Sequence, residues 1–341
     1  MSAGARPLAG VPFEYSAHAM SDKDVTEVVL ADAGGIAKAA RILESGGLVA
    51  VPTETVYGLA ARADNDEAVA KIYAAKGRPG FNPLIVHVRD VEQASLYGDF
   101  SDPVTQDIAQ VRWPGPLTLV VERRADAALA NAVTAGLPTV ALRSPAHPVM
   151  RRLLESVDFP LAAPSANRSG FISPTSAKHV LASLDGKIDL VLDAGPAEAG
   201  VESTILRITP EGEWRELRPG PVDVGALYRH YYDRELPVSI APAGITAPGQ
   251  LASHYAPGKP VRLDAREVAP DEFLIGFGGI AGDCTLSQSG DVTEAAARLY
   301  ACLHEAAVSD QARIAVAPVP HEGVGKAVND RLRRAATPPD Q

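Results

Sequence analysis

Two cations and an amide make residues 76–82 a candidate anion-binding turn. Lys76 and Arg78 flank a single glycine, and Asn82 follows four residues after the arginine. Arginine can hold phosphate oxygens through two parallel hydrogen bonds, while lysine acts as a compact point charge. The alternative is a basic helix C-terminus whose cations offset the helix macrodipole. Either way, the turn concentrates positive charge in a chain whose net charge is −10.

A second candidate segment, residues 162–170, has the sequence Ala-Ala-Pro-Ser-Ala-Asn-Arg-Ser-Gly and follows a short apolar stretch. It contains Ser165 and Asn167, and Ser173 comes shortly afterwards. Loops at strand ends are where α/β proteins commonly bind ligands. The alternative, which applies especially to Ser173 and Thr175, is that hydroxyl side chains cap turns and helices.

Three further polar residues are uninformative individually and indicate a function only together with the candidate residues above. His87 lies in an apolar strand and by itself is typical of a core histidine, while Ser203 and Arg218 lie at the ends of expected strands. The chain has no HExxH motif, no G-x-S-x-G motif and no Ser-His-Asp order. A cleft of cations, hydroxyls and amides without a nucleophile favours catalysis by positioning and charge stabilisation.

Nucleotide-binding fingerprints are weak in this sequence. Residues 276–281 match G-x-G-x-x-G/A after an expected strand, but no helix is expected to begin before about residue 291. The chain also has no P-loop sequence. If a nucleotide binds, other residues must hold its phosphates.

The hydrophobic pattern predicts the elements that would position these residues. More strands than helices, in irregular order, indicate an α/β fold with a twisted mixed sheet flanked by helices. The expected helices begin near residues 36, 65, 103, 148 and 175, and the expected strands cover 48–51, 83–88, 117–121, 139–142, 161–163, 188–192, 203–208 and 214–217.

The length of 341 residues favours two domains. We expect a loose N-terminal segment (1–24), a catalytic domain (25–232), a Pro-rich linker (233–259) and a smaller C-terminal α/β domain (260–341). Strands expected at 261–263, 273–277 and 314–317, with helices over 292–307 and 325–335, predict a parallel sheet in the last domain.

Composition excludes several classes of protein. Apolar residues are 46% and charged residues 22% of the chain, so it is neither disordered nor collagen-like. Apolar stretches such as 117–121 and 273–280 fall far short of the roughly 20 residues that span a bilayer, and no secretory signal is evident. Cys284 and Cys302, without a CxxC pair, predict neither a zinc site nor a disulfide framework, so a cytoplasmic location is the default.

Taken together and in order, these segments resemble the YrdC-like threonylcarbamoyl-AMP synthase family in its longer, two-domain form. The resemblance covers roughly residues 35–224, and 254–257 and 323–331 resemble the linker and C-terminal signatures of that form. The matching segments are 52–59 (PTETVYGL), 76–78 (KGR), 82–87 (NPLIVH), 113–118 (WPGPLT), 163–167 (APSAN), 200–205 (GVESTI) and 218–220 (RPG).

The resemblance implies synthesis of threonylcarbamoyl-adenylate from L-threonine, bicarbonate and ATP, with release of pyrophosphate. A separate transferase would use the product to modify tRNA, so tRNA is only an indirect partner, and the C-terminal domain would be Rossmann-like. Magnesium would be carried by ATP, with no metal ligand from the protein and no organic cofactor. By the resemblance, Thr55, His87, Arg143, Ala163 and Ser203 bind threonine, and Lys76, Arg78, Asn82, Thr139, Ser165, Ser173, Arg218 and Tyr255 bind ATP. The cationic turn and the absence of a nucleophile predict that Lys76 and Arg78 are catalytic.

The linker departs from the family pattern S-P-G-M-K/R-Y-R/K-H-Y-A-P. Residues 247–257 read APGQLASHYAP, so the Met and basic positions are lost while Tyr255 is retained. Because the linker is long and keeps that tyrosine, we expect it to fold over the first domain's cleft as a lid.

Two alternative functions are an RNA-binding module that uses a basic cleft and a related carbamoyl-transfer enzyme. The acidic net charge disfavours the first. The larger chains of the second carry zinc-finger and acylphosphatase segments, which this sequence does not contain.

Overall fold

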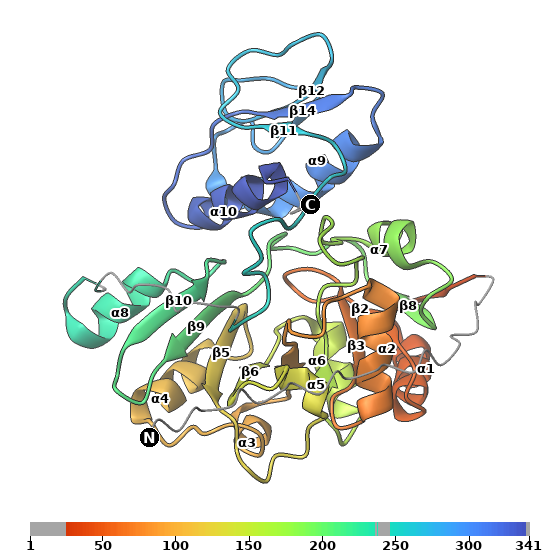
Figure 1. Ribbon diagram of the computed structural model, residues 1–341, viewed down its shortest axis with the longest axis vertical. Helices are drawn as coiled ribbons and strands as arrows, with labels where there is room; N and C mark the ends of the chain where they lie inside the picture. Colours follow the sequence, from red (N-terminus) through yellow and green to blue (C-terminus); the bar gives the residue numbers. More distant parts are fainter. Residues whose placement is uncertain (1–24, 236, 238–245, 339–341) are drawn as a thin grey trace, which may run out of the picture.

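The computed structural model describes residues 25–235, 237 and 246–338, which fold around two separate β-sheets (Figure 1). The expected loose segment 1–24 lies outside the described residues, as do residues 236 and 238–245 of the expected linker. The domain boundaries at 232 and 259 remain a prediction. The described strands of the larger sheet all precede residue 232, and those of the smaller sheet all follow residue 259.

The larger sheet is mixed, as the irregular order of expected strands predicted. Its strands lie in the order β1-β8-β2-β3-β7-β4-β6-β5-β9-β10 and pair in both parallel and antiparallel fashion. They are β1 (Glu27–Leu30), β2 (Val49–Val51), β3 (Gly58–Arg62), β4 (Ile85–His87), β5 (Leu117–Glu122), β6 (Thr139–Arg143), β7 (Leu161–Ala162), β8 (Leu190–Asp193), β9 (Thr204–Ile208) and β10 (Trp214–Arg218).

Helices cover both faces of this sheet, because successive residues of a strand point to opposite sides. Val49 and Val51 pack with one apolar cluster, whereas Ala50 between them belongs to another. The helices of the first cluster are α1 (Ala33–Glu44) and α6 (Pro148–Glu155). Those of the second are α2 (Asp66–Lys76), α3 (Val91–Ala94), α4 (Pro103–Arg112), α5 (Asn131–Thr134), α7 (Ala177–Leu184) and α8 (Val224–Tyr232).

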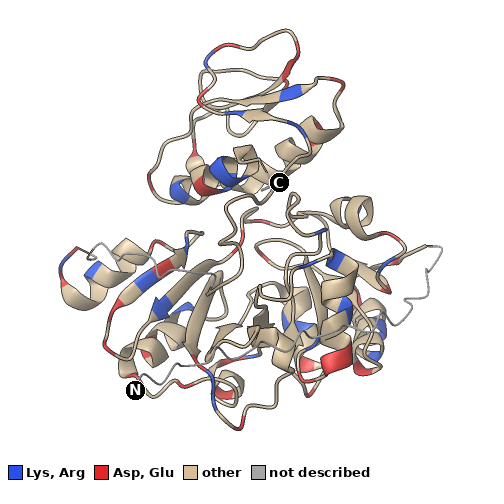
Figure 2. Cartoon of the chain, viewed as in Figure 1, with Lys and Arg blue, Asp and Glu red and all other residues tan. Residues whose placement is uncertain are grey.

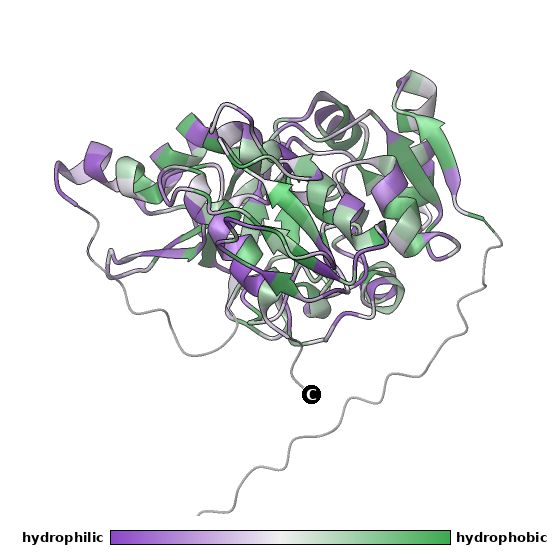
Figure 3. Ribbon diagram, turned by 90° about the horizontal axis from the view of Figure 1, so that it is seen from above, coloured by the Kyte–Doolittle hydropathy of each residue, from purple (hydrophilic) through white to green (hydrophobic). Residues whose placement is uncertain are grey.

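Figure 3 shows the hydrophobic residues concentrated on the central strands, as expected for a sheet buried on both faces.

The smaller sheet is parallel throughout, as predicted. Its order is β11-β14-β12-β13, from β11 (Val261–Arg262), β12 (Glu272–Gly276), β13 (Cys284–Thr285) and β14 (Arg313–Val316). Helices α9 (Val292–Val308) and α10 (Gly325–Ala336) lie between it and the larger sheet (Figure 1). Helix α9 begins only after Asp291, so residues 276–281 lack the helix that a dinucleotide fingerprint needs. A Rossmann-like classification stays a prediction.

Two sequence-based predictions were wrong. Cys284 and Cys302 form a disulfide, which a separation of 18 residues did not suggest; the fold places β13 beside α9 and brings their Cα atoms to 6.0 Å. Asp64 and Glu67 have the spacing of a capping box, which predicts Asp64 as the N-cap of helix α2. The N-cap is instead Asn65, whose side chain accepts from the Ala68 backbone N–H. The Asp64 carboxylate is instead bonded to Arg62 at 2.8 Å.

Candidate active site

A single cavity brings together most of the sequence-predicted site residues. It has about 560 Å³ of empty space, including its open mouth. Its walls come from segments that are far apart in the sequence, at the ends of several strands and in the linker. The predicted residues that line it are Thr55, Arg78, His87, Arg143, Ala163, Ser165, Ser203, Arg218 and Tyr255.

Arg143 is held on one side of the cavity by three protein groups. It is the last residue of β6, and its strand partner on β4 is His87. Its Nη2 donates to Glu54 Oε1 at 2.6 Å, its Nη1 to Thr55 Oγ1 at 3.1 Å and its Nε to the Gly115 carbonyl at 3.2 Å. The guanidinium is therefore fixed in one orientation.

Glu54 and the Gly115 carbonyl were missed as functional groups in the sequence. Both belong to segments that carry the family resemblance, 52–59 and 113–118. The sequence therefore identified these segments, but it did not show that Glu54 and the Gly115 carbonyl contact Arg143. Burial raises the pKa of Glu54, but the adjacent Arg143 guanidinium more than offsets it, so the pKa lies below its ordinary value. Glu54 is thus an anion beside Arg143.

His87 is a neutral imidazole beside these charges. It is 2% exposed, and burial, with a further contribution from Arg143, lowers its pKa to about 3. Its Nδ1 has no hydrogen-bond partner among the described residues. A neutral histidine with an unused ring nitrogen can position a ligand without adding charge.

Arg218 and Ser203 form another part of the cavity wall. The Nε and Nη2 atoms of Arg218 donate to the Ser203 carbonyl at 3.1 and 3.0 Å, and Nη2 also donates to Ser203 Oγ at 3.0 Å. Ser203 Oγ lies 2.7 Å from Thr118 Oγ1. The backbone approaches closely here, because a Cβ on Gly220 would lie 2.3 Å from the Thr204 nitrogen.

The two cations of the 76–82 turn have different surroundings. Gly77 ends helix α2 with φ +57°, and Arg78 beyond it lines the cavity while donating to the carbonyls of Asn82 and Pro83. Burial lowers the pKa of Arg78 to about 10, so it stays charged at neutral pH.

Lys76 does not line the cavity. Its Nζ donates to the carbonyls of Ser165 and Asn167 at 2.6 and 2.5 Å, and its side chain is 1% exposed. Burial and the nearby Arg78 hold its pKa well below the usual range. In this structure Lys76 therefore fixes the 165–167 loop.

Three other predicted residues also lie outside the cavity lining. Thr139 starts β6, four residues from Arg143, which places it about 13 Å along the strand. Ser173 donates to Glu202 Oε1 at 2.5 Å. Asn82 is fully buried, and neither atom of its side-chain amide has a hydrogen-bond partner among the described residues.

The linker contributes to the cavity. Pro248, Gly249, His254 and Tyr255 are among its lining residues. Tyr255 is 1% exposed, and its hydroxyl has no hydrogen-bond partner among the described residues. A Cβ on Gly249 would lie 3.1 Å from that hydroxyl and 3.0 Å from Arg218 Cδ, so the linker packs closely against the Arg218 wall.

Two family models match successive parts of the chain. One, described as "Telomere recombination" and named for Sua5, YciO and YrdC, matches residues 41–220. The other, described as "Threonylcarbamoyl-AMP synthase, C-terminal domain", matches residues 233–337. The chain belongs to the two-domain threonylcarbamoyl-AMP synthase family.

Relatives of this family match over most of their length. A Threonylcarbamoyl-AMP synthase from Bacillus subtilis is 38% identical over 348 residues, covering 92% of this chain and 96% of the relative. One from Pyrococcus abyssi is 35% identical over 320 residues, covering 87% and 93%. The crystal structure of P. abyssi Sua5 complexed with L-threonine superposes with a TM-score of 0.81 at 34% identity, covering 92% of this chain and 97% of that chain.

Within the described residues, no helix is both long and apolar enough to cross a membrane. Figure 2 shows Lys and Arg interspersed with Asp and Glu along the chain. Because charges of both signs are mixed along the chain, their distribution does not by itself identify a ligand.

Proposed function

We propose that this chain synthesises L-threonylcarbamoyladenylate from L-threonine, bicarbonate and ATP, releasing pyrophosphate and water. Membership of the threonylcarbamoyl-AMP synthase family supports this activity. The observation that carries the proposal is that Arg78, Arg143 and Arg218 all line one cavity. Three guanidinium groups suit a reaction that must bring a carboxylate and a triphosphate together.

Threonine would bind on the Arg143 side, together with Thr55, His87, Ala163 and Ser203. The fixed guanidinium suits a carboxylate, and a related protein has been crystallised with L-threonine. The unpartnered Nδ1 of His87 is available for a ligand polar group.

ATP would bind on the side of Arg78 and Arg218, with Ser165 and Tyr255 nearby. Arg78 and Arg218 would offset the charge of the phosphates as catalytic groups. Lys76 was predicted to share that role, but its bonds to two loop carbonyls support a positioning role for the Ser165 loop. Asn82, Ser173 and Thr139 stay predicted ATP ligands without a cavity contact in this structure.

The reaction would proceed without a covalent enzyme intermediate. Bicarbonate takes up a proton and gives carbon dioxide and water. The threonine amine attacks the carbon dioxide and gives a carbamate, which returns one proton. A carbamate oxygen then attacks the α-phosphorus of ATP in line, forming the adenylate and expelling pyrophosphate. The protein would bring two anions together and offset their repulsion.

Magnesium would enter as the ATP complex and reduce the charge of the leaving pyrophosphate. Among the described residues, no three His, Cys, Asp or Glu side chains are grouped to hold a metal ion. The product would pass to a separate transferase that modifies tRNA, so we place the reaction in the cytoplasm with ATP and tRNA.

Pyrophosphate release tests this proposal. The purified chain is incubated with ATP, magnesium, bicarbonate and threonine, and each component is omitted in turn. We expect pyrophosphate only when threonine and bicarbonate are both present. In Arg78→Ala, adenylate formation should be abolished while threonine still binds; normal turnover of this variant would remove the proposed role of Arg78. Steeply salt-dependent RNA binding without turnover would instead support the RNA-binding alternative.

A further inference from the structure

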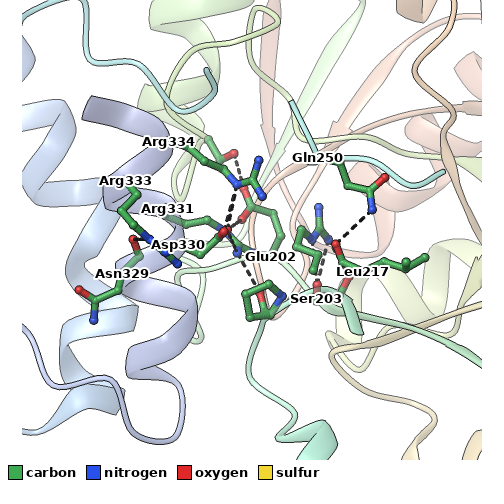
Figure 4. Close-up of polar contacts among 12 residues, drawn as sticks. Glu202, Ser203, Leu217, Gln250, Asn329, Asp330, Arg331, Arg333 and Arg334 are labelled. Carbon is green, nitrogen blue, oxygen red and sulfur yellow. Dashed lines mark hydrogen bonds and ion pairs between the residues drawn. The ribbon is translucent and has the colours of Figure 1, made fainter. Parts of the chain in front are cut away.

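Glu202 connects the cavity wall to the two C-terminal helices α9 and α10. Its Oε1 accepts from Ser173 Oγ at 2.5 Å and from the Tyr300 hydroxyl at 3.0 Å. Its Oε2 accepts from Arg331 Nε at 3.0 Å (Figure 4). The same oxygen accepts from the Tyr300 hydroxyl at 2.8 Å. Tyr300 belongs to α9 and Arg331 to α10, so this carboxylate is bonded from both helices.

The segment that carries Glu202 lies directly on α9. Gly200 has φ +69°, and a Cβ at this position would be 2.3 Å from the Ala296 carbonyl oxygen and 2.5 Å from Ala297 Cα. Only a glycine allows this approach. Because Glu202 itself lines the cavity and immediately precedes Ser203, the position of α9 is transmitted to the wall within three residues.

Arg331 reaches two further parts of the same wall. Its Nη1 donates at 2.8 Å to the carbonyl of Pro219, the residue that follows Arg218. Its guanidinium carbon lies 5.5 Å from the ring centroid of Tyr255, in the linker. The side chain is fully buried, and Asp330 supplies a second carboxylate contact at 2.9 Å.

We infer that Arg331 is a positioning residue for ATP binding, acting through Glu202, Pro219 and Tyr255 from outside the cavity. This inference rests on the proposed function, because it assigns ATP to the wall formed by Arg218 and Tyr255. Arg331 does not line the cavity. Its bonds set where Arg218 and Tyr255 stand, and small displacements of positioning groups can lower rates strongly.

The opposite charges of Glu202 and Arg331 favour one arrangement of the two side chains. Burial raises the pKa of Glu202, but Arg331 and Arg218 more than offset it and bring the pKa to about 2. A buried ion pair is a weak source of stability compared with apolar residues of the same size. Its directional bonds do, however, define where both partners lie. Positioning therefore accounts for the bonds to Ser173 and Pro219 and for the ring contact with Tyr255 better than cohesion between helices does.

The test compares Arg331→Met with a matched control on the same helix, Arg333→Met. Arg333 is exposed on α10, and its side chain donates to the Asn329 carbonyl within its own helix. For the full-length variants, the Kd for ATP is measured by direct equilibrium binding, and KM for ATP and threonine by pyrophosphate release. We expect Arg331→Met to weaken ATP binding roughly 10-fold or more, with less than about a 3-fold change in the threonine KM. Arg333→Met should match the wild type.

Two further variants separate positioning from simple charge neutralisation. In Glu202→Gln/Arg331→Met, both charges are removed, so the unfolding temperature should recover relative to Arg331→Met while ATP binding stays weak. Recovery of both would overturn the inference, as would wild-type ATP affinity in folded Arg331→Met. If Arg331→Met does not fold, Tyr300→Phe, which removes one hydroxyl and no charge, should weaken ATP binding a few-fold, and unchanged affinity would overturn the inference.

Direct binding also keeps this inference distinct from the proposed activity. Wild-type protein that binds ATP but releases no threonine-dependent pyrophosphate would refute the activity alone, and the variants would still test Arg331. Wild-type protein that binds no ATP would overturn both.

Discussion

The guanidinium of Arg143 and the carboxylate of Glu54 form a buried pair at 2.6 Å, with side-chain exposures of 5% and 11%. This pair orients Arg143 before any ligand arrives. Because the two charges offset each other, the cavity can offer a carboxylate-binding fork without an uncompensated buried cation.

Replacing Arg143 should raise the requirement for threonine. We expect Arg143→Ala to increase the threonine KM by about 100-fold, since a charge-assisted bond contributes about 3 kcal/mol. The variant should also lose about 3 kcal/mol of unfolding free energy, because Glu54 is left buried without its partner. Pyrophosphate release against threonine concentration and urea unfolding measure the two effects. An unchanged threonine dependence would show the assignment to be wrong.

Lys76→Met should act on the Ser165 loop. It leaves the Asn167 carbonyl without its lysine donor, which costs roughly 1–3 kcal/mol for one unpaired group. The Ser165 carbonyl also loses the lysine but keeps a bond from the Asn167 backbone N–H at 3.0 Å. We expect weaker ATP binding and a lower unfolding temperature. The control is Lys71→Met on the same helix, whose lysine donates to one carbonyl, that of Gly46. Equal ATP affinity in the two variants would contradict a loop-positioning role for Lys76.

Tyr255→Phe removes a hydroxyl that has no protein partner among the described residues. Its loss should therefore leave the unfolding temperature nearly unchanged. If the hydroxyl contacts ATP, the ATP KM should rise by about 5- to 10-fold, consistent with loss of one hydrogen bond of about 1 kcal/mol. Steady-state kinetics at saturating threonine would measure this. An identical ATP KM would mean that the hydroxyl has no ligand role.

Buried neutral histidines should make the protein sensitive to mild acid. Burial lowers the pKa of His87 to about 3, below the unfolded value of about 6.5. Between these pH values the unfolded chain binds more protons, so stability falls as pH decreases, by up to about 1.4 kcal/mol per pH unit for each such group. Burial lowers the pKa of His254 to about 3 as well, so it should add to the slope.

His87→Gln isolates one histidine's contribution. Urea unfolding from pH 6.5 to 4.5 should give a shallower dependence on pH than the wild type. The exposed His321, for which we use His321→Gln, serves as the control and should leave the slope unchanged. Parallel slopes for wild type and His87→Gln would rule out this histidine as a source of acid sensitivity.

The sequence predicted the mixed sheet, the parallel C-terminal sheet and half of the cavity-lining residues, because these depend on hydrophobic periodicity and on recognisable segments. It did not predict β1, β3 or α8. Glu54 was missed because its role depends on β6 placing Arg143 beside it. The position of Lys76 outside the cavity lining was missed because its Nζ bonds to loop carbonyls that are distant in the sequence. The disulfide was missed because only the fold brings Cys284 to Cys302. Such contacts between distant segments are not encoded in local spacing.

The order in which the wall segments occur along the chain has a consequence for biosynthesis. Thr55 emerges early from the ribosome, Tyr255 much later, and Arg331 later still. Since N-terminal regions generally fold first during translation, the large sheet can form before the linker residues that line the cavity, and Arg331 behind them, have been synthesised. Catalytic competence would then arise only after Tyr255 and Arg331 have been synthesised, so a nascent polypeptide that ends before them would not consume ATP.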